Sequence, residues 1–348
     1  MPAPGPTFPT RELPTVEAMI KANGLTKRYG GRTRRPGRTG RTGTPVGTGK
    51  TVVDDLTFTV EPGAVTGFLG PNGAGKSTTM RMIMGLDAPT AGHVTVGDRA
   101  YAAHPAPLHE VGGLLEARAV HPGRTAHHHL MALAHTHGIP GSRVEHVLGL
   151  TGLTDVAGNR VKGFSLGMGQ RLGIAAALLG DPATVILDEP VNGLDPEGVL
   201  WIRNLLKSLA AEGRTVFVSS HLMSETALTA DRLIIIGRGR LLAETTVADF
   251  VRDSGVTAMK VVSPGARTLA SLLAGPGVEI APGAASDELD VRGVDGAYIG
   301  RIAAAHAVPL YELTPRTASL EQAFMDLTRD EVEYQAGTTH DAPTGAAA

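Results

Sequence analysis

The stretch Gly70-Pro-Asn-Gly-Ala-Gly-Lys-Ser77 decides the fold of this 348-residue chain. It follows the apolar run Val65–Leu69, which predicts a buried strand, and it leads into Ser77–Gly85, which predicts a helix. The pattern G-x-x-x-x-G-K-[ST] between a strand and a helix is typical of the phosphate-binding loop of α/β proteins. Its glycines let backbone N–H groups face phosphate oxygens, and the helix N-terminus adds partial positive charge. The sequence therefore predicts a nucleotide site at this loop.

Side chains of the loop have separate expected tasks. Lys76 would reach the β- and γ-phosphates, and the Ser77 hydroxyl would bind Mg²⁺. The expected nucleotide contacts in the loop are Gly70, Pro71, Asn72, Gly73, Ala74, Gly75, Lys76, Ser77 and Thr78. A second glycine-rich segment, Gly47-Thr-Gly-Lys-Thr51, lacks a preceding strand and carries Thr44 where the pattern requires glycine, so we reject it as a nucleotide site.

A second motif, Thr184-Val-Ile-Leu-Asp188-Glu189-Pro190, is an apolar strand that ends in two carboxylates. Asp188 suits the shell of a Mg²⁺ ion, and Glu189 lies one residue further, where a general base for an attacking water is needed. Two acids after a strand can also be a solvated strand end. The upstream phosphate loop favours the catalytic interpretation.

Between these motifs lies Gly163-Phe-Ser-Leu-Gly-Met-Gly-Gln-Arg171, followed by the apolar helical stretch Leu172–Leu179. Ser165 is a candidate N-cap for this helix. The same glycine-rich helix start could hold an anion on its exposed amides. The residues of this segment alone leave both interpretations open.

Composition sets the wider limits. The formal charge of −2 gives no global basic field for nucleic acid, and the absence of cysteine excludes disulfides and zinc thiolates. The longest apolar runs are far below the roughly 18–20 residues of a membrane span, and the N-terminus has no apolar signal segment. We expect another chain to supply any membrane spans.

Changes in composition along the chain predict its division into domains. We expect a disordered extension over residues 1–18, an α/β domain over 19–245 and a small α+β accessory domain over 246–335, with a disordered tail over 336–348. The basic, glycine-rich residues 31–51 are either a flexible surface insertion or a contact to phosphate or anionic lipid. In the accessory domain, strands are expected at 258–262, 289–291 and 309–313, and helices at 267–273 and 297–306.

The order of motifs along the chain carries a family resemblance. The phosphate loop is followed by the Ser-x-Gly helix at Ser165, the Asp-Glu strand, the turn Gly193-Leu-Asp195, and Ser219-Ser-His221 after a further strand. This order, over about residues 19–245, resembles the nucleotide-binding domain of ABC transporters, a P-loop NTPase fold with a helical subdomain. The C-terminal stretch 313–324 resembles the bacterial antibiotic- and drug-exporter branch.

The resemblance implies roles for individual residues. Tyr29 would stack on adenine, His221 would contact the γ-phosphate, and Asp195 would communicate across a dimer. Ser165 and Gly167 would contact the γ-phosphate of ATP held by the opposite subunit. Lys76, Glu189 and His221 form the implied catalytic set; Ser77, Asp188 and Glu116 form the implied Mg²⁺ set.

The implied protein is an ATPase subunit that binds ATP and Mg²⁺ and powers export of a drug, antibiotic or similar amphipathic substrate. Its implied partners are a second ATPase subunit and integral-membrane permease subunits at the cytoplasmic face of the membrane. An alternative is a soluble ABC ATPase acting on nucleic acid or ribosomes, although the tandem ATPase domains and coiled-coil insertions typical of those proteins are not found here.

The chain departs from the family pattern at two places and also carries a cluster of histidines. The signature has Phe164-Ser-Leu-Gly-Met168 where the family usually has Leu-Ser-Gly-Gly-Gln, and Glu116 takes the place of a glutamine that touches Mg²⁺. A carboxylate can still bind Mg²⁺, but it adds negative charge beside the γ-phosphate. The histidines of residues 121–137 lack the i, i+3 or i, i+4 spacing of a helical metal site, so they predict a polar helix surface.

Overall fold

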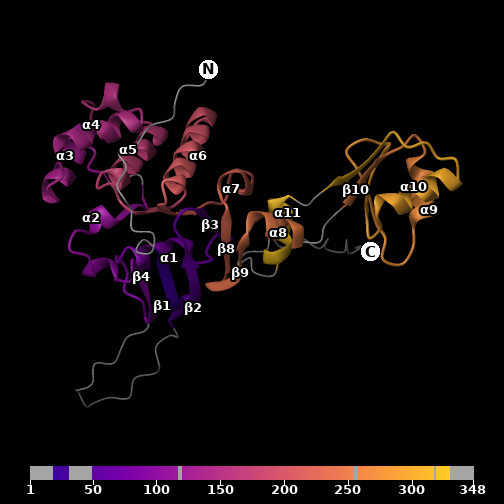
Figure 1. Cartoon of the computed structure of the whole chain (residues 1–348), viewed down its shortest axis with the longest axis horizontal. Helices are drawn as coiled ribbons and strands as arrows, with labels where there is room; N and C mark the ends of the chain where they lie inside the picture. Colours follow the sequence, from indigo (N-terminus) through magenta and orange to yellow (C-terminus); the bar gives the residue numbers. More distant parts are fainter. Residues whose placement is uncertain (1–18, 31–48, 117–119, 254–257, 317–318, 330–348) are drawn as a thin grey trace, which may run out of the picture. The chain divides into compact units, whose positions relative to one another are not determined.

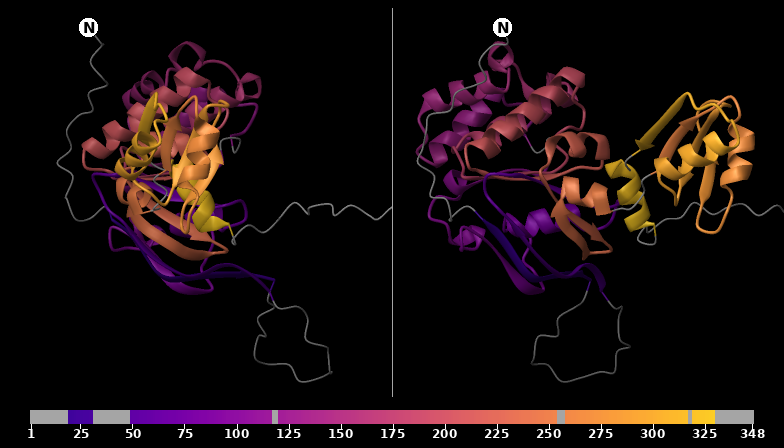
Figure 2. Two further views of the ribbon diagram at one scale, coloured as in Figure 1. Left: turned by 90° about the vertical axis from the view of Figure 1, so that its right-hand side faces the viewer. Right: turned by 45° about the vertical axis from the view of Figure 1, so that its right-hand side comes forward.

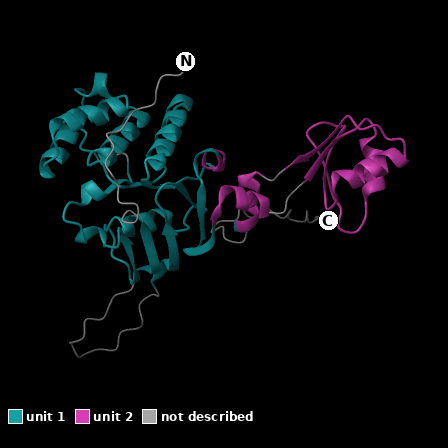
Figure 3. Ribbon diagram, in the orientation of Figure 1, with its two compact units in different colours: residues 1–222, 228–244, 328–348 teal, residues 223–227, 245–327 magenta. Residues whose placement is uncertain are grey.

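A computed structural model of the chain describes residues 19–30, 49–116, 120–253, 258–316 and 319–329. The expected N-terminal extension, most of the basic insertion and the expected tail therefore lie outside the described residues. The chain divides into two compact units (Figure 3). One comprises residues 1–222, 228–244 and 328–348, and the other comprises residues 223–227 and 245–327.

The first unit is built on a six-stranded sheet. Its strands, in spatial order, are β5 (Val111–Leu114), β6 (Thr184–Leu187), β7 (Thr215–Ser219), β3 (Val65–Leu69), β8 (Arg232–Gly237) and β9 (Arg240–Thr246). The pairs β5–β6, β6–β7, β7–β3 and β3–β8 are parallel, so the carboxyl ends of these five strands lie along one edge. The α/β fold expected from the sequence is confirmed.

A smaller antiparallel sheet lies beside the first. It has the order β2 (Lys50–Val60), β1 (Ile20–Tyr29), β4 (Ala91–Val96). Helix α1 (Lys76–Ile83) follows the phosphate loop and lies close to this sheet (Figure 1). Lys50 and Thr51 belong to strand β2 rather than to a helix, in agreement with the rejection of the second glycine-rich segment.

Alternate strand residues build separate cores on the two faces of the large sheet. Phe217 of β7 faces the small sheet and packs against Phe58 and Phe68, with ring centroids 5.9 and 5.0 Å apart. Its neighbours Val216 and Val218 point to the opposite face. This two-residue alternation is what a parallel sheet covered on both faces requires.

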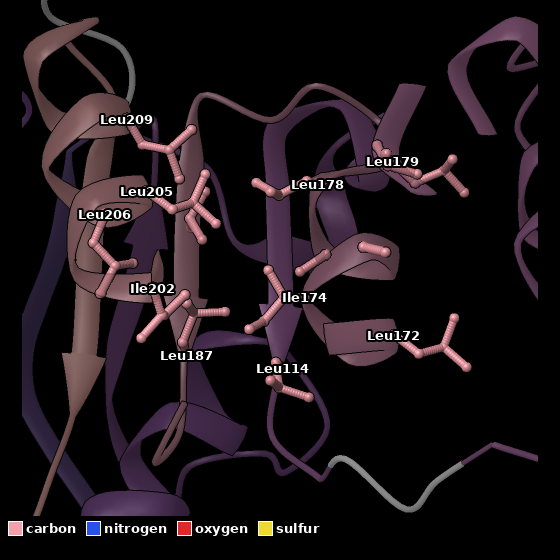
Figure 4. Close-up of a cluster of buried hydrophobic side chains, with 14 of the residues drawn as sticks. Leu114, Leu172, Ile174, Leu178, Leu179, Leu187, Ile202, Leu205, Leu206 and Leu209 are labelled. Atoms are coloured by element: carbon pink, nitrogen blue, oxygen red, sulfur yellow. The ribbon is translucent and has the colours of Figure 1, made fainter. Parts of the chain in front are cut away.

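The opposite face is covered by α5 (Leu166–Leu178) and α6 (Pro196–Ala211). Ile174 and Leu178 of α5 point toward the sheet, whereas Leu172 and Leu179 point away from it (Figure 4). The apolar helix predicted over Leu172–Leu179 is confirmed, and it begins earlier, at Leu166.

Helices α3 (Ala126–Thr136) and α4 (Gly141–Leu150) gather with α5 away from the small sheet (Figure 2). This group is the helical subdomain that the resemblance implied. The remaining short helices of the region are η1 (Tyr101–Ala103), α2 (Pro107–Glu110), η2 (Thr154–Val156) and η3 (Val161–Gly163).

The histidine cluster is largely a helix surface. His128 and His135 on α3 are exposed, and no group of three metal-binding side chains occurs among the residues that the structure describes. Nε2 of His127 lies 3.1 Å from Oε1 of Glu145 on α4, which is outside the histidine segment 121–137. His129 departs from the predicted polar surface: it is partly buried, and burial, with the nearby positive charge of Arg124, lowers its pKa.

The second unit carries a four-stranded antiparallel sheet. Its order is β11 (Glu279–Pro282), β12 (Glu288–Arg292), β10 (Ala258–Val262), β13 (Glu312–Arg316). Helices α9 (Ala266–Leu273) and α10 (Gly296–Ala305) contribute to its core, and α7 (Met223–Thr229), α8 (Val247–Asp253) and α11 (Leu320–Thr328) are the other helices.

One strand prediction for this unit needs correction, and one strand was not predicted. The strand expected over 309–313 begins only at Glu312, because register pairing with β10 runs from Glu312 to Arg316. Strand β11 was not predicted, because its short sequence Glu-Ile-Ala-Pro has no apolar run of strand length; in the structure none of its four residues is fully buried. No helix of the described parts of the chain is long and apolar enough to cross a membrane.

Candidate nucleotide-binding site

Three strands bring the predicted catalytic residues to one edge of the large sheet. Strand β3 runs into the phosphate loop, β6 into Asp188 and Glu189, and β7 into the segment ending at His221. Together they enclose a pocket of about 470 Å³, lined by Val52, Pro71, Asn72, Gly73, Ala74, Gly75, Lys76, Ser77, Thr78, Asp188, Glu189, Asn192 and His221. Ligands of open α/β sheets bind at this carboxyl edge.

Glycine is required at the turn of the loop. Gly73 and Gly75 have φ angles of 82° and 102°, in the left-handed region that favours glycine. A Cβ atom on Gly75 would lie 2.7 Å from the carbonyl oxygen of Val52, and one on Gly70 would lie 2.6 Å from that of Ile236. The loop therefore packs closely on its neighbours, with no room for side chains at these two positions.

Lys76 is buried beneath the loop. Its Nζ donates to the carbonyl oxygens of Gly70 and Pro71 at 2.5 and 3.3 Å. Burial lowers the pKa of Lys76, and the negative charges of Glu189 and Asp188 oppose that shift. The ammonium group is therefore held by the loop carbonyls in the same pocket as the two carboxylates, where a phosphate chain would bind.

Ser219, at the end of β7, contacts the side chain of Asp188 and the backbone of Glu189. Its hydroxyl donates a short hydrogen bond to Oδ1 of Asp188 and accepts one from the backbone N–H of Glu189 at 2.9 Å. The Glu189 carboxylate in turn contacts His221: Oε2 lies 2.7 Å from Nδ1 and accepts from the backbone N–H at 3.3 Å. The acids, which are adjacent in sequence, therefore have different partners.

Glu189 has a left-handed backbone with φ 51°. For a residue with a side chain this conformation costs roughly 1–2 kcal/mol, and such strain is often stored at functional sites. Surrounding groups hold it: the N–H donates to Ser219, and the carbonyl accepts from the side chain of Gln170 at 3.1 Å and from the N–H of Asn192 at 3.2 Å.

Three contacts predicted within one subunit are absent from the pocket lining: Tyr29, Gly70 and Glu116. Tyr29 is 43% exposed, and its hydroxyl donates to Asp87 at 3.2 Å, with Lys27 Nζ 5.1 Å from the ring centroid. Glu116 is exposed just after β5.

The signature segment, residues 164–168, does not line this pocket in its own chain. Ser165 is the N-cap of α5, as predicted, and accepts from the N–H of Met168 at 3.2 Å. It lines a different cavity of about 330 Å³. A Cβ on Gly167 would lie 2.9 Å from the carbonyl oxygen of Gly193, so α5 and this turn are in close contact. Asp195 caps α6, accepting from the Gly198 N–H at 2.9 Å.

Besides Val52 of the pocket lining, sequence reasoning missed three residues at the site. Asn192 lines the pocket, Ser219 links the Asp188 carboxylate to the Glu189 backbone N–H, and Gln170 donates to the Glu189 carbonyl. Ser219 had one available signal, a hydroxyl at the end of an apolar strand beside the Asp-Glu strand. Gln170 and Asn192 had none, because their contacts depend on tertiary packing.

Comparisons with known proteins identify relatives of both parts of the chain. Residues 53–192 match the family described as ABC transporter, and residues 257–321 match a domain of unknown function, DUF8746. The chain is 37% identical over 298 residues to the uncharacterized ABC transporter ATP-binding protein YhcH of Bacillus subtilis (strain 168), covering 82% of this chain and 95% of that protein.

Two further relatives have more specific names. The bacitracin transport ATP-binding protein BcrA of Bacillus licheniformis is 39% identical, with 66% of this chain and 70% of that protein covered. The linearmycin resistance ATP-binding protein LnrL of Bacillus subtilis (strain 168) is 34% identical, with 80% and 94% covered.

Solved structures share the fold. An ATP-binding subunit of an ABC transporter superposes with a TM-score of 0.58 at 27% identity, covering 68% of this chain and 94% of that one. The dimeric ABC transporter cassette MJ0796 gives 0.57 at 23% identity, covering 66% and 98%.

Proposed function

Because the chain belongs to the ATP-binding proteins of ABC transporters, we propose that it hydrolyses MgATP in the pocket at the carboxyl ends of β3, β6 and β7. ATP hydrolysis would drive export of an antibiotic-like substrate through separate membrane subunits. The observation that carries the proposal is the single pocket that contains the phosphate loop, Lys76, Asp188, Glu189 and His221. These are the groups that phosphoryl transfer to water requires.

Each group has a distinct task in the proposed reaction. The loop N–H groups and Lys76 hold the β- and γ-phosphates, and Ser77 and Asp188 would hold Mg²⁺, which neutralises phosphate charge when bound. Glu189 accepts a proton from the water that attacks the γ-phosphorus. The bond between that phosphorus and the bridging oxygen breaks, releasing ADP and phosphate.

His221 is proposed to orient the base. Its ring nitrogen, 2.7 Å from Oε2, fixes one carboxylate oxygen of Glu189. The other oxygen of Glu189 remains for the attacking water, and the His221 side chain, half exposed, can reach the γ-phosphate.

The active form is proposed to be a dimer of two such chains. Ser165 and Gly167 do not line the nucleotide pocket of their own chain, so they are available to contact ATP held by a second subunit. The exposed amide end of α5 suits a phosphate. Leu166 is 46% exposed and packs beside Gly193. Leu166 and Met168 would lie at that contact, where the family usually has a glycine and a glutamine.

Export of an antibiotic or similar amphipathic compound is proposed from the relatives. BcrA is named for bacitracin transport and LnrL for linearmycin resistance. The chain would act as a peripheral protein at the cytoplasmic face, bound to permease subunits that supply the membrane spans. We further propose residues 19–245 as the ATPase domain and 246–335 as its accessory domain. Tyr29 and Glu116 are proposed as adenine and Mg²⁺ contacts that form once nucleotide is bound.

The test is to co-express the chain with candidate multi-span permease subunits and to measure efflux of bacitracin and linearmycin from cells. We expect efflux with the wild-type chain and none with Lys76→Ala at equal expression. Equal efflux by both chains would contradict ATP-driven export, and ATPase activity without efflux of any such compound would contradict the substrate class.

A further inference from the structure

Gln170 lies inside the signature helix and reaches the segment that follows β6. It is only 4% exposed, on the first turns of α5. Its Nε2 donates to the backbone carbonyl oxygen of Glu189 at 3.1 Å, across 19 residues of sequence. A buried side-chain amide therefore contacts the main chain of the proposed general base rather than its carboxylate.

The peptide that Gln170 contacts is strained. Glu189 has φ 51°, and this left-handed backbone directs the carboxylate toward His221. Ser219 holds the N–H side of the residue, and Gln170 is the side chain that holds its carbonyl side. A strained backbone conformation persists when surrounding contacts over-determine it.

Helix α5, which carries Gln170, packs tightly against its neighbours. Gly173 lets α5 approach β5 closely, since a Cβ there would lie 2.5 Å from Cδ1 of Leu114. The guanidinium of Arg171 stacks 4.4 Å from the centroid of the Trp201 ring and donates to the carbonyl of Thr151 at 3.0 Å. These contacts fix helix α5 against the sheet, and they therefore fix the position from which the Gln170 side chain extends.

The same helix start contacts the turn that follows Glu189. Leu166 and Gly167 pack against Gly193, whose φ of 76° places it in the left-handed region. Helix α5 thus contacts residues 189–193 at both ends of that segment, and Gln170 is the member of this contact that touches the base residue itself.

We propose that Gln170 is a positioning residue for hydrolysis, which holds the Glu189 backbone in the left-handed conformation that aims its carboxylate at the attacking water. This inference rests on the proposed function, because it requires Glu189 to be the base. A general base has to be within hydrogen-bond reach of the proton it takes, and a small misplacement lowers the rate without lowering affinity.

A purely structural role for Gln170 can be separated from a role in hydrolysis. The Glu189 carbonyl also accepts from the Asn192 N–H at 3.2 Å, so removing the Gln170 amide leaves that oxygen with a partner. Gln170→Met keeps about the same side-chain length and replaces the terminal amide, with its N–H donors and its carbonyl acceptor, by an apolar thioether. Any stability loss is therefore separable from an effect on the base.

The experiment measures kcat, KM and ATP affinity for the purified full-length chain, Gln170→Met, Glu189→Gln and the double variant. Ile174→Val is the control, since it perturbs packing of the same helix without touching residue 189. We expect Gln170→Met to lower kcat by about tenfold to a hundredfold, with ATP affinity by calorimetry changed less than about threefold. Ile174→Val should retain the wild-type kcat.

The double variant decides whether Gln170 acts through Glu189. With the base already removed, Gln170→Met should cause no further loss in single-turnover hydrolysis. An equal loss in both backgrounds, an unchanged kcat in Gln170→Met, or a parallel fall in ATP affinity would each overturn the inference. Absence of hydrolysis by the wild-type chain would instead overturn the proposed function and, with it, this inference.

Discussion

Replacement of Glu189 by glutamine is the sharpest test of the proposed chemistry. The amide is isosteric with the carboxylate, so its oxygen can still accept from the His221 ring and backbone N–H groups that now lie 2.7 and 3.3 Å away. The backbone contacts to Ser219 and Gln170 do not involve the side chain. We therefore expect the pocket to keep its shape and ATP to bind with nearly wild-type affinity.

The amide cannot take the proton of the attacking water. Loss of a general base slows turnover by about 10²–10⁴, which corresponds to about 2.7–5.4 kcal/mol of activation free energy at roughly 1.36 kcal/mol per tenfold. Phosphate release at saturating MgATP measures the change, and calorimetry measures the affinity for ATP.

A matched control removes the same charge elsewhere. Glu61 lies in the turn between β2 and β3, is more than half exposed and is outside the pocket. Glu61→Gln should turn over at the wild-type rate. Turnover of Glu189→Gln within about threefold of wild type, with normal folding, would refute the assignment of the base.

Three further outcomes are expected. Lys76→Ala should severely weaken ATP binding in calorimetry, because the buried ammonium beneath the loop is lost; normal affinity would contradict the phosphate site. Deleting residues 32–48 with a short glycine link should leave ATPase activity largely intact, because Tyr29 and Lys50 are direct partners in the β1–β2 ladder; complete loss of activity would show that this segment shapes the site. Burial lowers the pKa of His129 below 6.5, so the unfolded chain binds the proton first as pH falls. The melting temperature of wild type should drop more than that of His129→Gln below pH 6.5, and parallel curves would contradict this.

The accessory unit was predictable in outline because its core strands and helices carry apolar residues at regular spacing. Val261 and Leu289 are buried, and both belong to predicted strands. Edge strand β11 has little apolar character, so local pattern could not find it. Edge strands pack on fewer neighbours, and their sequences are correspondingly less constrained.

Local sequence was sufficient for those features whose cause is local. Glycine spacing and the Lys-Ser pair specified the phosphate loop, and Ser165 specified the start of α5. The apolar run Val185–Leu187 followed by two acids specified β6 and its carboxylates. In each case a single segment of chain contains both the signal and the structure that it produces.

The assembly of the site depends on tertiary structure. Three contacts of Glu189 join segments that are 19 to 32 residues apart in the sequence: those with His221, with the Ser219 hydroxyl and with the Gln170 side-chain amide. They form because β6, β7 and β3 pair in parallel and end at the same edge, an order that no local window of sequence contains. Likewise, the expected adenine contact Tyr29 bonds to Asp87, 58 residues away, because strand pairing rather than local preference sets its surroundings.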